Sequence, residues 1–99
     1  MTTAEMRAEL EAQPRMEPGT EGWWQVWGAC VRDIRPGDAV AFAHDGVTEW
    51  HYVEDTFVAK NAPIRWGIVE DGERYTLGAF TPIALLRRGT HHTLAGSVR

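Results

Sequence analysis

Hydrophobic and polar residues alternate in two segments that flank Asp71-Gly72, and this is the clearest pattern in the chain. An Asp-Gly pair favours a type I′ turn, which joins two antiparallel strands in a defined register. One face carries the pairs Glu70–Glu73, Ile68–Tyr75, Trp66–Leu77 and Ile64–Ala79. Apart from the two glutamates beside the turn, this face is apolar. The opposite, mixed face carries the pairs Val69–Arg74, Gly67–Thr76 and Arg65–Gly78. A slip of one residue would bury both arginines, so the pattern predicts this register for residues 64–79.

A second hairpin is predicted over residues 39–53, and its loop allows two registers. The three-residue loop His44-Asp45-Gly46 pairs Val40 with Trp50 and Phe42 with Thr48. A two-residue loop pairs Val40 with His51 and Phe42 with Glu49 instead. We prefer the three-residue loop, because the shorter one sets apolar residues against His51 and Glu49.

The other segments complete a mainly β chain. Residues 23–31 read as a strand that is apolar on both faces, with Trp23, Gln25 and Trp27 pointing one way. Residues 35–38 have the Pro-Gly centre of a type II turn, and the alternation loses phase at residues 54–56, where a bulge or bend is expected. After Thr81-Pro82, residues 83–87 form a last short strand with Ile83 and Leu85 inward.

The N-terminus has the spacing of a helix start. Thr2 and Glu5 are placed as in a capping box, and the helix should end before Pro14. We therefore expect an N-terminal helix and linker (residues 1–22), a β-barrel domain (residues 23–87) and a flexible tail (residues 88–99). The predicted fold is a small SH3-like barrel of five or six antiparallel strands, with an OB-like barrel as the alternative. We expect its interior to be filled by Val40, Phe42, Trp66, Ile68, Tyr75 and Leu77.

Length and composition narrow the class of protein. Ninety-nine residues are enough for one domain with one core. Cys30 is the only cysteine, so no intramolecular disulfide is possible and a reducing, cytoplasmic location is expected. No apolar run is long enough for a signal sequence or a membrane span, so no membrane association is expected.

Charge is uneven along the chain. Residues 1–55 hold eleven acidic and four basic residues (−7), whereas residues 56–99 hold three acidic and six basic residues (+3). This balance argues against sequence-independent binding of nucleic acid, which needs clustered Lys and Arg.

Several motifs resemble those of a known group of domains. The stretches 34–40 (Ile-Arg-Pro-Gly-Asp-Ala-Val) and 49–53 (Glu-Trp-His-Tyr-Val), the Asp71-Gly72 turn and the closing 83–85 (Ile-Ala-Leu) carry the resemblance. Together they resemble small SH3-like barrel domains of uncharacterised actinobacterial and actinobacteriophage proteins. The resemblance implies an SH3-like fold and an origin in actinobacteria or their phages, and it implies no catalytic residues.

The residues that could support chemistry do not form a recognisable set. His44, His51, Cys30 and the pair His91-His92 lack the close spacing of a metal site. We interpret Cys30 as a small core residue, and Glu54 and Asp55 should point to opposite sides of a strand. We expect no enzymatic activity, no metal and no cofactor.

The five tryptophans are the strongest remaining feature, because a barrel of this size buries only some of its aromatic residues. We therefore predict a non-catalytic protein-interaction module that binds a protein or peptide partner or forms a homodimer. Its predicted contact residues are Trp23, Trp24, Trp27, Trp50 and Tyr52. In a competing interpretation, the N-terminal helix covers one face of the Trp-rich strand through Met6 and Leu10. The alternative function is nucleic-acid binding, with Trp50 or Tyr52 as a stacking platform and the arginines Arg65, Arg74, Arg87 and Arg88.

Overall fold

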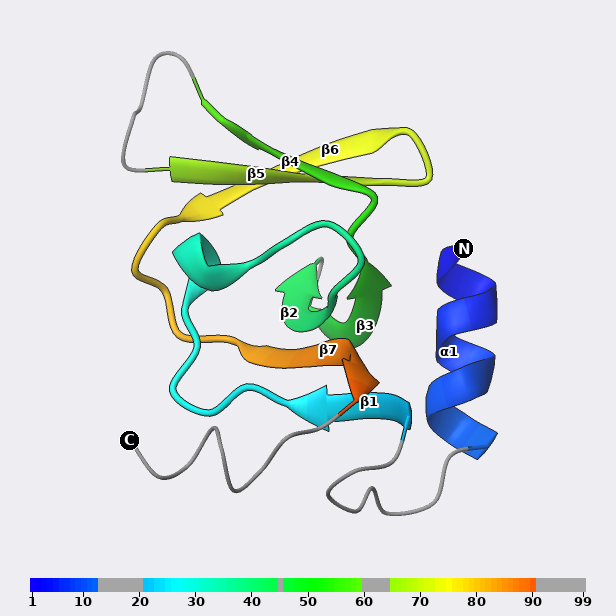
Figure 1. The fold of residues 1–99 in the computed structure, drawn as a ribbon. Coiled ribbons are helices and arrows are strands. Elements are labelled where there is room, and N and C mark those ends of the chain that lie inside the picture. The colour runs from blue at the N-terminus through cyan, green and yellow to red at the C-terminus, as the bar shows by residue number, and fades with distance from the viewer. Residues whose placement is uncertain (13–20, 45, 60–64, 91–99) are drawn as a thin grey trace.

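Seven strands form two antiparallel sheets in the computed structural model, which describes residues 1–12, 21–44, 46–59 and 65–90. The elements are α1 (Thr3–Ala12), β1 (Glu21–Gln25), the 3-10 helix η1 (Val31–Asp33), β2 (Ala39–His44), β3 (Val47–Tyr52), β4 (Asp55–Val58), β5 (Arg65–Glu70), β6 (Glu73–Gly78) and β7 (Ala84–Thr90). One sheet has the order β1-β7-β2-β3 and the other has the order β4-β5-β6. The three-stranded sheet lies across the top of the view in Figure 1, and α1 stands beside the four-stranded sheet.

The β5–β6 hairpin has the predicted register. Trp66 pairs with Leu77, Ile68 with Tyr75, and Glu70 with Glu73. Asp71 and Gly72 both have positive φ, of 48° and 84°, as a type I′ turn requires. The predicted pair Ile64–Ala79 lies outside the described residues at Ile64.

The preferred register of the β2–β3 hairpin is wrong, and the two-residue alternative is the one formed. Val40 pairs with His51 and Phe42 with Glu49, because β2 ends at His44 and β3 begins at Val47. A shift of one residue exchanges the faces of a strand. Trp50 and Tyr52 therefore lie on the same face as the small residues Ala41 and Ala39, and His51 points to the core side.

The Trp-rich strand is shorter than predicted and the last strand is longer. β1 ends at Gln25, and a turn with Gly28 at φ 68° follows. β7 continues to Thr90, so residues 88–90 belong to a sheet and not to the predicted tail, while residues 91–99 lie outside the described residues.

The chain passes from one sheet to the other at the predicted bend. β3 ends at Tyr52 and β4 begins at Asp55, with a bend at Glu54. The predicted type II turn is also formed, since Asp38 N donates to Arg35 O at 3.1 Å and Gly37 has φ 94°. The described strands pair as two separate sheets, and closure into one barrel is not detected among them.

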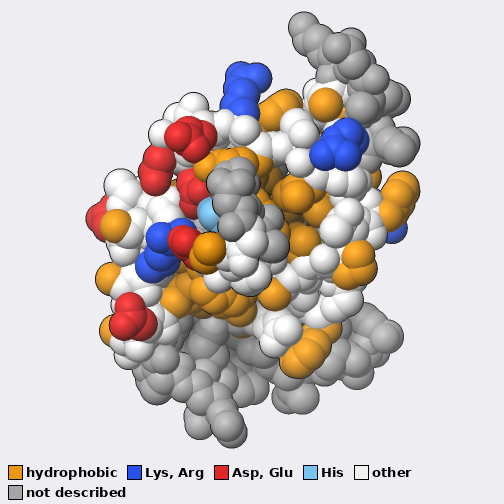
Figure 2. Space-filling view, turned by 180° about the vertical axis from the view of Figure 1, so that it is seen from behind, with side chains coloured by type: hydrophobic (Ala, Val, Ile, Leu, Met, Phe, Trp, Pro, Cys, Tyr) orange, Lys and Arg blue, Asp and Glu red, His pale blue; other side chains and the backbone are white. Residues whose placement is uncertain are grey.

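The main core lies between the two sheets. Its fully buried members include Val40, Val53, Ile68 and Leu85. The other four predicted interior residues, Phe42, Trp66, Tyr75 and Leu77, are partly buried and pack against this core. Figure 2 shows apolar side chains gathered across the middle of one face of the molecule, with the acidic side chains on the left half of that view.

A second, smaller core joins α1 to the outer face of the four-stranded sheet. The predicted capping box starts the helix: Glu5 N donates to Thr2 Oγ1 at 3.1 Å, and Thr2 N donates to Glu5 Oε1 at 2.8 Å. Met6 is fully buried in a cluster with Trp23 and Ala39. The residues that pack around this cluster are Leu10, Trp50, Tyr52 and Leu86.

Candidate functional site

Helix α1 occupies the face on which three of the five predicted contact aromatics lie. Trp23 is 2% exposed, and its Nε1 donates to Glu9 Oε1 at 2.9 Å. Trp50 and Tyr52 pack in the same cluster. The structure therefore agrees with the competing interpretation, in which the helix covers this face through Met6 and Leu10.

Polar contacts along the whole length of α1 hold it in place. Arg7 Nε donates to Trp50 O at 2.8 Å, and Arg7 Nη2 lies 2.6 Å from Glu49 Oε2. At the other end, Arg88 Nε donates to Glu9 Oε1 at 3.1 Å. A partner could reach Trp23 only if these contacts were broken and α1 were displaced.

The other two predicted contact residues lie elsewhere. Trp24 is half-buried and faces Arg87 across the β1–β7 pair. Trp27 lies in the turn after β1 and is 82% exposed. Of the aromatic residues predicted as contacts, Trp27 is thus the one that is already presented to solvent.

A second exposed aromatic residue, Phe80, lies on the chain segment that pairs with the loop after Trp27. Phe80 is 66% exposed, and the Arg32 guanidinium carbon lies 5.0 Å from its ring centroid. The two segments are joined by Ile83 N donating to Ala29 O at 3.2 Å and by an isolated bridge between Cys30 and Pro82. Arg32 lies beside Phe80 at one end of this paired stretch, and Trp27 lies at its other end, next to Val26, whose N–H donates to Leu85 O; we call these three exposed side chains the Trp27–Phe80 edge.

Sequence reasoning missed Phe80. It follows the end of β6 and precedes Thr81-Pro82, where strand alternation no longer says which way a side chain points. The available indication was its position in a turn, because large apolar residues in turns have little to cover them.

The arginines proposed for nucleic-acid binding separate into two places. Arg65 and Arg74 lie on the same outer face of the β5–β6 hairpin, as predicted. Arg87 and Arg88 lie on β7 in the other sheet and are already engaged: Arg87 with Asp38 and Arg88 with Glu9. The four side chains do not make one continuous basic surface.

The outer face of the three-stranded sheet carries an aromatic ring between the first two arginines. A Cβ at Gly67 would overlap the far end of the Phe57 ring, so this ring lies directly over the Gly67 backbone. The Arg74 guanidinium carbon is 4.8 Å from the ring centroid, and Arg65 Nη2 donates to Thr76 O at 3.0 Å. This arrangement was not expected from the sequence.

A buried polar cluster links the helix start to both sheets. Glu70 Oε2 accepts from Thr3 Oγ1 at 2.9 Å and from Tyr52 N at 3.1 Å, and Glu70 Oε1 lies 2.7 Å from His51 Nδ1. His51 stacks on Phe42 with ring centroids 4.2 Å apart. Glu70 and His51 are each 7% exposed, so a substrate has little access and the cluster serves to position α1.

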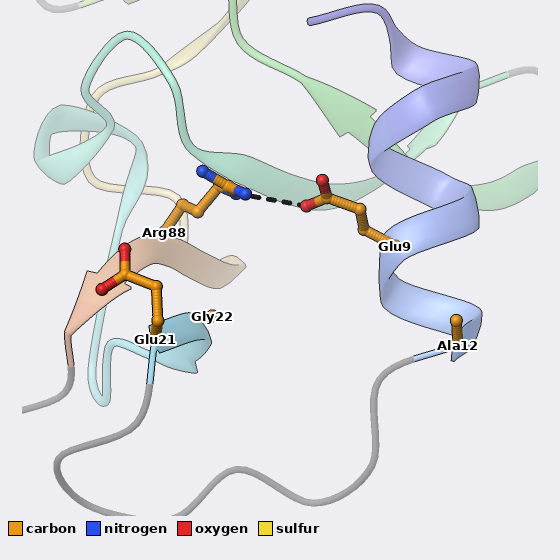
Figure 3. A pocket seen from close by; sticks show the side chains of 5 residues that line it. All are labelled: Glu9, Ala12, Glu21, Gly22 and Arg88. Carbon is orange, nitrogen blue, oxygen red and sulfur yellow. Dashed lines mark hydrogen bonds and ion pairs between the residues drawn. The ribbon is translucent and has the colours of Figure 1, made fainter.

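A pocket of about 280 Å³ lies between the second half of α1 and strands β1 and β7 (Figure 3). Its charged lining consists of Glu9, Glu21 and Arg88, and Arg88 reaches across to Glu9. A second pocket of about 410 Å³, which Arg88 also lines, lies at the turn before β2. Neither pocket holds a nucleophile beside a histidine.

The described residues contain no group of three or more His, Cys, Asp or Glu side chains that could hold a metal ion. Cys30 is half-buried at the start of η1, and its backbone N–H donates to Asp33 Oδ2 at 2.9 Å, which lowers the pKa of that carboxyl group. Glu54 and Asp55 are exposed, and His91-His92 lie outside the described residues.

The comparisons with known proteins bring no relative to this chain: no protein family, no curated protein and no solved structure matches it. No helix in the described parts of the chain is long and apolar enough to cross a membrane.

Proposed function

We propose that this protein is a non-catalytic protein-interaction module whose contact surface is the Trp27–Phe80 edge. The observation that carries the proposal is the exposure of two large aromatic side chains, 82% for Trp27 and 66% for Phe80, on two paired segments. Trp and Arg are enriched among the residues that dominate binding energy at protein interfaces. Arg32 supplies the arginine beside Phe80.

The other predicted contact aromatics support this choice of surface by their burial. Trp23, Trp50 and Tyr52 are already packed with Met6 of α1, so they contribute to folding without a partner. Nothing comparable covers Trp27 among the described residues. The proposed contact surface therefore narrows from five predicted residues to Trp27, joined by Phe80 and Arg32.

The partner in this proposal is a cytoplasmic protein or a second copy of the chain. The acidic first half of the sequence, with eleven acidic and four basic residues in positions 1–55, favours the approach of a basic partner. An SH3-like barrel, and an accessory role in an actinobacterium or its phage, remain the proposed family and setting, supported by the turn motifs that resemble those domains.

Photo-crosslinking tests the proposal directly. A photoreactive amino acid at position 27 should give a specific crosslinked product, either to one protein in the native cell or to a second copy of the chain. The same group at Glu11, which is exposed on α1, is the matched control and should not give it. Phe80→Ala should reduce the yield, while the melting temperature stays close to that of the wild type. Equal yields from positions 27 and 11, or no product from position 27, would contradict the proposal.

A second candidate function is single-stranded nucleic-acid binding on the outer face of the three-stranded sheet. It is favoured by the exposed Arg65 and Arg74 on either side of Phe57, since aromatic rings and arginines on a sheet are how such surfaces stack bases. Fluorescence polarisation with mixed oligonucleotides at low salt should then show binding that weakens steeply with salt. Arg74→Gln should bind the oligonucleotides more weakly than the wild type does at the same salt concentration. A flat titration of the wild type at ~50 mM salt would exclude this function.

A further inference from the structure

Three arginines line one pocket in a chain whose net charge is −4. The pocket has a volume of about 410 Å³ and lies where the type II turn, the end of β3 and the end of β7 meet. Arg35 comes from the turn, Tyr52 from β3, and Arg87 and Arg88 from β7. We call it the Arg35 pocket.

A buried carboxylate fixes the orientation of the central arginine. Arg87 Nε donates to Asp38 Oδ1 at 3.0 Å, and Arg87 Nη2 donates to Asp38 Oδ2 at 2.9 Å. Asp38 is 2% exposed, and Arg87 Nη2 also donates to Asp33 O at 2.9 Å. Arg87 is thus held rigidly, and its Nη1 group makes none of these contacts. A guanidinium group carries five N–H donors, so donors remain for a ligand.

The acidic residues near the pocket form ion pairs with two of its three arginines. Asp38 pairs with Arg87 and Glu9 pairs with Arg88. Arg35 is exposed and makes no ion pair with the described residues. Asp33 also lies beside Arg87, whose Nη2 donates to its carbonyl oxygen, so the three arginines face three carboxylates, and Arg35 is the arginine of the pocket without an ion pair among the described residues.

We propose that the Arg35 pocket binds the phosphate group of a small phosphate monoester. Guanidinium groups from the turn (Arg35) and from β7 (Arg87 and Arg88) can donate to a tetrahedral phosphate from more than one side, whereas a planar carboxylate is satisfied by one arginine fork. The half-buried Tyr52 ring adds a surface for a flat organic group attached to the phosphate. This site is independent of the Trp27–Phe80 edge.

Titration of the full-length chain, followed by NMR of the arginine Nε–H resonances, tests this site. Inorganic phosphate should give saturable shifts of Arg35 and Arg87. Arg35→Gln should weaken binding about tenfold, the effect of losing one charge-assisted contact. Arg32→Gln, three residues earlier and beside Phe80, is the matched control and should bind as the wild type does.

A second titration distinguishes free inorganic phosphate from the phosphate group of an organic monoester. A nucleoside 5′-monophosphate should bind more tightly than inorganic phosphate if the ligand carries a flat ring, and Tyr52→Leu should remove only that difference. Equal affinity for both would assign the site to phosphate alone. Shifts that never saturate, or an equal loss in Arg35→Gln and Arg32→Gln, would overturn the proposal.

Discussion

Met6 is the residue on which the position of α1 depends most. It is fully buried against Trp23 and Ala39, although the helix that carries it has only ten residues. A helix of this length is marginal by itself, so its stability must come from this packing.

Replacing Met6 should therefore be costly. We expect Met6→Ala to lower the free energy of unfolding by about 2–4 kcal/mol, because it leaves a cavity between helix and sheet. Urea denaturation measures the change. Glu11→Ala, at an exposed position of the same helix, should change stability by less than about 0.5 kcal/mol. Similar values for the two variants would show that α1 does not pack on the sheet.

Gly67 is required by the ring of Phe57 and not by its own backbone angles. Gly67→Ala should cost about 1–3 kcal/mol, because the new methyl group overlaps the ring and pushes it away from Arg74. The cost should fall by at least about 0.5 kcal/mol in a Phe57→Ala background, as measured in a double-mutant cycle. Additive effects would contradict the contact.

The buried hydrogen bond between Thr3 and Glu70 offers a third residue-level test. Thr3→Val keeps the shape of the side chain but leaves Glu70 Oε2 with the Tyr52 N–H as its remaining donor among the described residues. We expect a loss of about 1–3 kcal/mol by urea denaturation. A Thr3→Ser variant, which keeps the hydroxyl group, should retain most of the stability. Equal losses in Val and Ser variants would indicate that the hydrogen bond contributes nothing.

At the scale of elements, the start of α1 should respond to pH. The Thr2 backbone N–H donates to the Glu5 carboxylate and lowers the pKa of Glu5 below its ordinary value of 4.5. Since the folded-state pKa is the lower one, this contribution to stability is present above pH 4.5 and is lost as the pH falls through the lowered pKa.

An NMR titration of the Glu5 side chain checks this prediction. The wild-type pKa should lie below 4.5, and Thr2→Ala should move it back toward 4.5 because the first turn of the helix frays. A wild-type Glu5 pKa at or above 4.5 would mean that the capping box does not form in solution.

The two hairpins show why only part of the fold could be predicted. Asp71-Gly72 fixes a two-residue turn, and a slip there would bury Arg65 and Arg74, so the β5–β6 register followed from the sequence. At residues 44–46 both loop lengths were chemically acceptable, and the choice depended on which residues could be buried. The buried pair of His51 with Glu70 makes the shorter loop acceptable, but this pair joins residues 19 positions apart and no local pattern reveals it.

The same limit applied to the candidate site. Trp27 was one of five predicted contact residues. Trp23 is buried because α1 packs on it, whereas Trp27 is exposed, and the sequence does not show where α1 packs. The Gly28 turn and the end of β6 expose Trp27 and Phe80, and alternation along a strand says nothing about residues beyond the end of that strand.

At the scale of the whole molecule, the two aromatic surfaces have different roles. The outer face of the four-stranded sheet is covered by α1, and the Trp27–Phe80 edge is open. The central claim is that α1 covers the outer face of the four-stranded sheet and leaves the Trp27–Phe80 edge exposed. Without this cover, the proposed contact surface would include Trp23 and Trp50.

Fluorine NMR of the chain labelled with 5-fluorotryptophan, in the presence of a soluble paramagnetic agent, tests this claim most directly. Each of the five tryptophans gives its own resonance, assigned by single Trp→Phe substitutions. The Trp27 resonance should broaden most and the Trp23 resonance least, in line with exposures of 82% and 2%. A Trp23 resonance that broadens as strongly as that of Trp27 would show that α1 leaves the sheet uncovered and would contradict the account.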